Sequence, residues 1–268
     1  MRAEPLFAIV IAFAAGCAPP DAATQLDTTT HSLYRDWGDS DANPMQSVAA
    51  ALDAQLAKLN FDGGTGGRSF RFTPLNRSDL VDVSWPMDKD PHNAIGACVA
   101  RRSGWPIDDQ ARFVLSPDQA AAEPTAKSYT RTFVDPTDPS CFVGQGCPVL
   151  LTDNQITRDT PVLTVSFLLH KNLRWVRLDG DRWAIAARSF TDQPYPGAKA
   201  GTGIEQSYSI DVFLGQADGR TVRYQCSWAQ TDVGFALDDD LALSVLVGGV
   251  DDAMAATDTA IGKQLHGM

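Results

Sequence analysis

The sequence predicts an α+β domain in which an antiparallel β-sheet packs against a long C-terminal helix, with one helix preceding the sheet. Three observations predict this class. Apolar and polar residues alternate along four segments of 161–228, as in strands with one dry and one wet side. Asp179-Gly180 and Asp218-Gly219 lie between neighbouring segments, and both dipeptides are strong hairpin signals. An apolar stripe at helical spacing then follows residue 240.

The first predicted helix covers residues 44–60. Pro44 suits a first helical position, and Val48, Leu52 and Leu56 recur at helical spacing. A glycine-rich run at 63–67 should end the helix. Because this run lacks the Gly-Lys-Ser/Thr ending of a phosphate-binding loop, we interpret it as a flexible connector.

Beyond this connector the apolar period changes to two, which predicts strands. We expect strands around 70–72 and 81–85, an irregular segment over 86–110, and weaker strands near 111–115 and 127–134. The clearest strands contain the alternating apolar residues of 163–169, 183–187, 208–214 and 222–228. Residues 44–268 should form a single domain, with a possible subdivision near 135–160.

The C-terminal helix should begin at the aspartates 238–240, which cap a helix N-terminus and oppose its positive dipole end. Gly248 and Gly249 interrupt the helix, each at a cost of about 1 kcal/mol relative to alanine. Two explanations are open at this point. The helix packs closely on the sheet there, or it kinks and widens a gap beside a ligand cavity.

The N-terminus has the anatomy of a signal peptide, with Arg2 followed by an apolar run from Leu6 to Ala15. The run is about half the roughly 20 residues of a membrane-spanning helix. The small residues before Cys17 resemble the lipobox of bacterial lipoproteins. An ordinary secretory signal cut nearby is the alternative.

The lipobox resemblance implies that residues 1–16 are a signal peptide that is removed, and that Cys17 carries the membrane-anchoring lipid, such as palmitate. Because Ala18 rather than Asp follows, the resemblance implies the outer membrane or the cell surface. Residues 17–43 are polar, with two prolines and a threonine run, and are predicted to be a flexible tether.

Four cysteines remain after Cys17, and an even number in an oxidising compartment indicates two disulfides. Three pairings are possible. The short, flexible stretch between Cys141 and Cys147 favours that pair, which leaves Cys98 with Cys226. A metal site is disfavoured because no Cys-x-x-Cys occurs and the histidines lie elsewhere.

The composition and motifs exclude several function classes. A net charge of −11 leaves no basic footprint for nucleic acid. No nucleophile elbow, His-Glu-x-x-His, EF-hand loop or dinucleotide fingerprint is present, so no catalytic residue, metal or cofactor is assigned. His31 lies in the predicted tether and His266 near the end of the chain, which leaves His92 and His170 as candidates for an enzyme. An enzyme is the third hypothesis.

Aromatic residues on successive strands suggest a ligand site. We expect their rings to face the C-terminal helix, where three of its apolar side chains would cover them. The candidate ligand-binding residues are Trp183, Tyr208, Tyr224, Trp228, Val247, Val250 and Met254. They form either an ordinary solid core or the lining of an apolar cavity.

The order of elements and the stretch from Arg174 to Trp228 (RWVRLDGDRWAIAARSF, a Pro/Gly loop, SYSIDVFL and DGRTVRYQCSW) resemble the lipid-binding START and wider helix-grip family. The resemblance covers about the last 105 residues. It implies a curved sheet around a long helix, and therefore a non-enzymatic binding protein for an apolar small molecule or lipid. The alternative is a structural or protein-interaction lipoprotein with a solid core.

Overall fold

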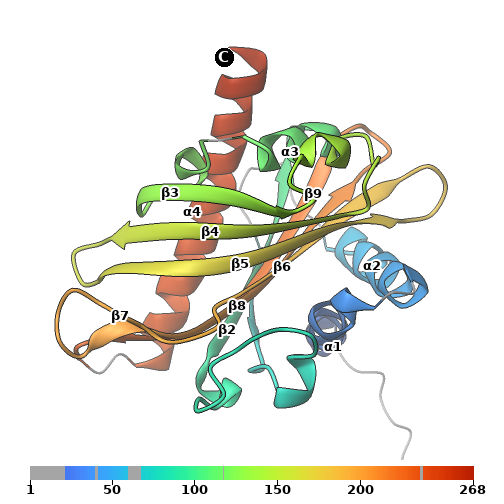
Figure 1. The fold of residues 1–268 in the computed structure, drawn as a ribbon. Coiled ribbons are helices and arrows are strands. Elements are labelled where there is room, and N and C mark those ends of the chain that lie inside the picture. Colours follow the sequence, from blue (N-terminus) through green and yellow to red (C-terminus); the bar gives the residue numbers. More distant parts are fainter. Residues whose placement is uncertain (1–21, 40–41, 60–67, 117, 236–237) are drawn as a thin grey trace, which may run out of the picture.

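One antiparallel sheet forms the centre of the protein, in the order β1-β2-β9-β8-β6-β5-β4-β3 with β7 paired to β8 (Figure 1). The structure is a computed structural model that describes residues 22–39, 42–59, 68–116, 118–235 and 238–268. The strands are β1 (Arg68–Phe72), β2 (Ile95–Ser103), β3 (Ala126–Asp135), β4 (Val149–Asp159), β5 (Thr164–Arg177), β6 (Trp183–Phe190), β7 (Tyr195–Pro196), β8 (Thr202–Gly215) and β9 (Thr221–Val233).

The two predicted hairpins are confirmed. β5 pairs with β6 across the turn at Asp179-Gly180, and β8 pairs with β9 across the turn at Asp218-Gly219. Both glycines adopt positive φ angles, of 59° and 79°, which glycine tolerates without steric cost. β4 pairs with both β3 and β5, so the strands on either side of the loop 136–148 belong to one sheet.

Within the described ranges, four α-helices cover the two faces of the sheet: α1 (Ala22–Arg35), α2 (Ala42–Ala57), α3 (Ile107–Val114) and α4 (Asp239–His266). The side chains of adjacent residues in β2 point to opposite faces of the sheet. Cys98 belongs to the core beneath α1 and α2, whereas Val99 packs against Val250 and Met254 of α4. Figure 1 shows α4 crossing behind a strongly twisted sheet. The predicted α+β class with a long C-terminal helix is confirmed.

The predicted tether over 17–43 is wrong for residues 22–38, because this segment is part of the core. Leu26, Leu33 and Tyr34 of α1 are buried, as is Trp37 in the 3₁₀ turn that follows (Asp36–Gly38). The apolar stripe of α1 is interrupted in the sequence, because Thr30 occupies a buried position between Leu26 and Tyr34. The signal peptide and Cys17 lie outside the described residues.

Other sequence predictions were confirmed or corrected locally. α2 corresponds to the helix predicted over 44–60, and β1 and β3 correspond to the strands predicted near 70–72 and 127–134. The expected strand at 81–85 is irregular, and the one at 111–115 is instead largely the helix α3. The predicted glycine connector lies outside the described residues.

β2 was expected to be irregular. It is a long strand that β1 and β9 flank, and most of its residues are buried, so both of its faces are covered. A strand covered on both faces does not alternate apolar and polar residues, and small residues such as Ala97 and Ala100 fit there. This is why the period of two is missing from its sequence.

α4 runs without interruption through Gly248 and Gly249. Asp238 caps its start by accepting a hydrogen bond from the Leu241 backbone N–H at 2.8 Å. A Cβ atom built on either glycine meets nothing within 4 Å, so the explanation by close packing on the sheet is wrong. The helix is anchored beyond them, through buried residues from Val250 onward.

Candidate functional site

The aromatic residues predicted to face the C-terminal helix lie mostly on the other side of the sheet. Tyr208 and Trp228 pack edge-to-face on Tyr34 of α1, with ring centroids 6.3 and 5.9 Å away. Tyr224 Oη lies 2.7 Å from Thr30 Oγ1 of the same helix. The prediction that these three rings face α4 is therefore wrong, because periodicity shows which residues share a face but not which helix covers it.

The remaining predicted ligand-binding residues do not meet these rings either. Trp183 lies on the opposite face, edge-to-face with Trp175 at 6.4 Å. Val247, Val250 and Met254 of α4 pack with Val99 of β2. The seven residues therefore do not line one common cavity.

The core around Trp228 is filled. Its indole Nε1–H donates to the Thr73 carbonyl at 2.9 Å, and its side chain is fully buried. A Cβ atom on Gly96 would lie only 2.6 Å from the indole ring, so the backbone of β2 packs directly against it. Trp228 itself therefore lies in a filled part of the core, as the alternative of a solid core requires.

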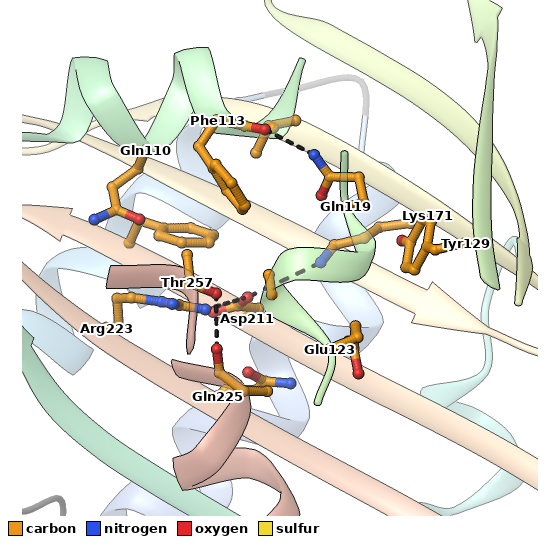
Figure 2. Close-up of a pocket in the computed structure, with 14 residues that line it drawn as sticks. Gln110, Phe113, Gln119, Glu123, Tyr129, Lys171, Asp211, Arg223, Gln225 and Thr257 are labelled. Atoms are coloured by element: carbon orange, nitrogen blue, oxygen red, sulfur yellow. Dashed lines mark hydrogen bonds and ion pairs between the residues drawn. The ribbon is translucent and has the colours of Figure 1, made fainter. Parts of the chain in front are cut away.

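A cavity of about 60 Å³ lies on the other face, beneath α4 (Figure 2). Its walls come from α3, α4, the 3₁₀ turn Ala120–Ala122 and strands β3, β5, β8 and β9. The lining residues are Gln110, Phe113, Val114, Gln119, Ala122, Glu123, Tyr129, Lys171, Asp211, Phe213, Arg223, Gln225, Ala253 and Thr257. Typical ligand pockets enclose roughly 300–1,000 Å³, so this one holds a few water molecules or a ligand of a few heavy atoms.

Three charged side chains from three strands meet at the cavity. Asp211 Oδ2 lies 3.5 Å from Arg223 Nη2 and 4.0 Å from Lys171 Nζ. The side chains of Asp211 and Arg223 are only 5% and 6% exposed. Figure 2 shows Arg223 and Lys171 reaching toward Asp211 from opposite sides. Burial lowers the pKa of Lys171, and the negative charge of Asp211 opposes this shift without cancelling it.

Several polar atoms at the cavity have no hydrogen-bond partner within the described part of the chain. They are Asp211 Oδ1, Arg223 Nε and Gln110 Oε1, all on buried residues. Buried polar atoms are nearly always hydrogen-bonded in folded proteins, and an unpaired one costs about 1–3 kcal/mol. These atoms can therefore bind a polar group that enters the cavity.

The rest of the lining is mixed. Phe113, Val114 and Phe213 are apolar and buried. Glu123 lies within 3.5 Å of Arg158, which offsets its negative charge. The site thus combines an apolar wall with buried charges.

Sequence reasoning missed Asp211 and Arg223 because it assigned their positions to the wet side of the strands, and it missed Lys171 because the predicted strand ended before this residue. Asp211 stands between Ile210 and Val212, which are buried in the core beneath α1. Strand length is a signal that could have revealed the site. β8 and β9 are long strands inside the sheet, with helices on both faces, and a charge in such a strand needs partners.

The two candidate catalytic histidines are not part of this cavity. His170 Nδ1 lies 2.7 Å from Asp153 Oδ1 and its ring stacks on Phe190. His92 is exposed in the 3₁₀ turn Pro91–Asn93, 3.1 Å from Asp90. Neither lines the cavity beneath α4. Within the described residues, no three His, Cys, Asp or Glu side chains form a group that could hold a metal ion.

Both predicted disulfides form. Cys98–Cys226 joins β2 to β9 at directly opposed positions, and Cys141–Cys147 closes a short loop. Among the helices of the described ranges, none combines the length and the hydropathy needed to cross a membrane.

No known family model matches this chain, and no curated protein matches its sequence. Solved structures with a similar fold include a STAR-related lipid transfer protein from Xanthomonas axonopodis, at 14% identity and a TM-score of 0.47 over 75% of this chain and 96% of its own. Human STARD10 is 10% identical, with a TM-score of 0.49 over 85% of this chain and 82% of its own. Human StAR-related lipid transfer protein 5 is 11% identical, with a TM-score of 0.43 over 84% of this chain and 98% of its own. Similarity this distant carries no argument about ligand or activity.

Proposed function

We propose that this chain is an exported, non-enzymatic binding protein of the cell envelope, anchored by lipid on Cys17, with its ligand site in the cavity beneath α4. The unpartnered polar atoms of buried Asp211, Arg223 and Gln110 carry the assignment of the ligand site. They are expected to bind a polar group inside the cavity. The lipobox resemblance at Cys17 supports the anchor, and the two disulfides support an oxidising compartment.

The charges favour a ligand with an anionic group. Lys171 and Arg223 both approach Asp211, so this group carries one uncompensated positive charge. A carboxylate could accept hydrogen bonds from Lys171 and from the unpartnered Arg223 Nε, where charge-assisted bonds are strong, whereas Asp211 Oδ1 and Gln110 Oε1 are acceptors and need a donor such as water or a ligand hydroxyl. Phe113, Val114 and Phe213 would contact a short apolar body on the same ligand.

The cavity volume limits the size of the ligand. At about 60 Å³ it accommodates a few heavy atoms, which is less than a lipid or a drug-sized molecule needs. In place of the apolar ligand or lipid expected from the sequence, the proposed ligand is therefore a small amphipathic anion. A longer apolar molecule would need α4 to move away from the sheet.

A structural or protein-interaction lipoprotein is the second candidate function. The filled core around Trp228 and the small volume beneath α4 favour it. It differs from the first candidate in one measurable property, which is the presence of a small ligand.

Titration calorimetry with straight-chain carboxylates from acetate to octanoate tests the ligand site. We expect the shorter acids to bind, and Lys171→Met to weaken binding by about tenfold or more, since a charge-assisted hydrogen bond contributes roughly 1.5–3 kcal/mol. Lys127→Met is the matched control, because Lys127 lies on β3 with its side chain 68% exposed. This control should bind like the unaltered protein.

The outcomes separate the two candidates. If none of the acids binds, and native mass spectrometry of protein from its own envelope shows no bound small molecule, the structural candidate stands. Preferential binding of octanoate would restore a larger apolar ligand. Incorporation of radiolabelled palmitate, and its loss in Cys17→Ser, tests the anchor separately.

A further inference from the structure

The linker between the proposed lipid anchor and the folded domain is very short. Cys17 precedes the first residue of α1, Ala22, by five residues. A chain spans at most about 3.6 Å per residue, so the sulfur-bearing residue lies within about 18 Å of the start of α1 in any conformation. The 27-residue tether predicted from the sequence would have allowed several times that reach.

α1 transmits this restraint to the whole domain because it is fixed in the core. Leu26 and Leu33 are buried, and Asp27 accepts hydrogen bonds from the Thr73 backbone N–H at 3.0 Å and from its hydroxyl at 2.7 Å. His31 lies 2.8 Å from the buried carboxylate of Asp79. A lipid on Cys17 would therefore hold the domain itself, and not a free segment, close to the bilayer.

The surface next to the start of α1 can be traced through these contacts. Thr73, which binds Asp27, directly follows the last residue of β1. Arg71 of β1 in turn pairs with Asp239 and Asp240 at the start of α4, at 3.5 and 3.4 Å. Figure 1 shows α1, the teal segment 73–94 and the start of α4 at one end of the molecule, whereas the C-terminus of α4 projects from the other.

Large apolar side chains are exposed at the end where α4 begins. Met87 is 70% exposed, Phe235 is 57% exposed and Leu241 is 48% exposed. Met87 and Phe235 lie at this end because residues close to them in the chain contact the start of β8. Lys89 pairs with Glu205 of β8, and Gly234 lies against Thr202 at the start of the same strand. We define the anchor-side surface by Met87, Phe235 and Leu241.

We infer that the anchor-side surface rests on the lipid bilayer when Cys17 is acylated, so that α4 stands with its N-terminus at the membrane and its C-terminus pointing away. This inference rests on the proposed lipid anchor. Met, Phe and Leu side chains can enter the boundary between lipid headgroups and acyl chains, where their contacts are apolar. The aspartates 238–240 beside Leu241 and the net charge of −11 disfavour anionic headgroups. The surface that fits is therefore a zwitterionic one.

Two leucines of α4 offer a matched test. Leu241 and Leu265 are both exposed, on one straight element, and 24 residues at about 1.5 Å each separate them by about 36 Å. With Cys17 blocked by lipid and the other cysteines in disulfides, a cysteine introduced by Leu241→Cys or Leu265→Cys is the single free thiol. Each acylated variant is labelled with an environment-sensitive fluorophore and reconstituted in phosphatidylcholine vesicles that carry nitroxide lipids.

The expected result is a blue-shifted emission and nitroxide quenching for the label at 241, with neither change at 265. Equal quenching at both positions, or stronger quenching at 265, overturns the inference. Insertion of a long Gly/Ser segment between Cys17 and Ala22 should reduce the quenching at 241. Mass spectrometry of the same samples separates the causes of failure. Absence of an acyl group on Cys17 overturns the anchor and this orientation together, whereas an acylated protein without quenching at 241 overturns the orientation alone.

Discussion

Thr30 Oγ1 and Tyr224 Oη lie 2.7 Å apart between α1 and β9, and both side chains are fully buried. The Thr30 hydroxyl donates its proton to the Leu26 carbonyl at 2.7 Å, so it accepts the proton of Tyr224. This bond links residues that are 194 positions apart in the chain. The first described helix therefore depends on a late strand for its place in the core.

Thr30→Val should destabilise the protein by about 1–3 kcal/mol, because it leaves the buried Tyr224 hydroxyl without an acceptor. Urea unfolding followed by circular dichroism measures the change. The double variant Thr30→Val/Tyr224→Phe should be closer to the unaltered protein than Thr30→Val alone, since both partners are then apolar. Thr28→Val, at an exposed position of α1, is the control. Equal losses for Thr28→Val and Thr30→Val would argue against the buried bond.

His31 should make stability depend on pH near neutrality. Burial lowers the pKa of His31, but the hydrogen bond and charge of Asp79 and the charge of Asp27 raise it by more, so its net pKa lies above 6.5. A raised pKa in the folded state means that this stabilisation is complete below pH 6.5 and is lost as the pH rises through the folded-state pKa. The advantage of the unaltered protein over His31→Gln should therefore shrink as the pH rises from 6.5 through the folded-state pKa.

Urea unfolding of both proteins at several pH values tests this dependence. His92→Gln is the control, because the His92 side chain is 57% exposed and its replacement should change stability little. A difference between the unaltered protein and His31→Gln that stays constant over this range would contradict the assignment.

Gly248→Ala and Gly249→Ala should each stabilise the protein, by about 1 kcal/mol. A methyl group at either position meets open space, and alanine has the higher helix propensity. Thermal unfolding of the single and double variants measures the gain. Gly262→Ala provides the contrast, because its Cβ would lie 3.1 Å from the Trp105 ring. A loss of stability at 248 or 249 would show that α4 is bent there.

The two disulfides should contribute unequally to stability. Cys98 and Cys226 are 128 residues apart, so their crosslink restricts the unfolded chain by about 5 kcal/mol, against about 2 kcal/mol for the six-residue separation of Cys141 and Cys147. Replacement of each pair by alanine, followed by denaturant unfolding, should reproduce this order. A larger loss from the 141–147 pair would refute the chain-entropy explanation.

The sequence predicted those parts of the fold that depend on local chemistry. The Asp-Gly turns need glycine at a positive φ, and the alternation in β8 and β9 is clear, so both hairpins were identified. α4 was identified from its aspartate cap and its stripe. The short spacing of Cys141 and Cys147 indicated the disulfide pairing.

The candidate site depends on arrangements that no local pattern contains. Whether Tyr224 faces α1 or α4 follows from how the sheet is covered, and both helices are apolar on one side. Lys171, Asp211 and Arg223 meet only because β5, β8 and β9 bring them to one face. α1 was missed because Thr30 occupies a buried position where an apolar residue was expected.

The dependence of α1 on β8 and β9 also sets an order of assembly. A chain that leaves the ribosome N-terminus first exposes the α1 segment long before the strands that receive it have been made, and closing so distant a contact is slow. Until that moment the apolar faces of α1 and α2 lack their partner. The core beneath α1 therefore cannot fold until most of the chain has been synthesised. A translocation channel for unfolded chains accepts a polypeptide in this state.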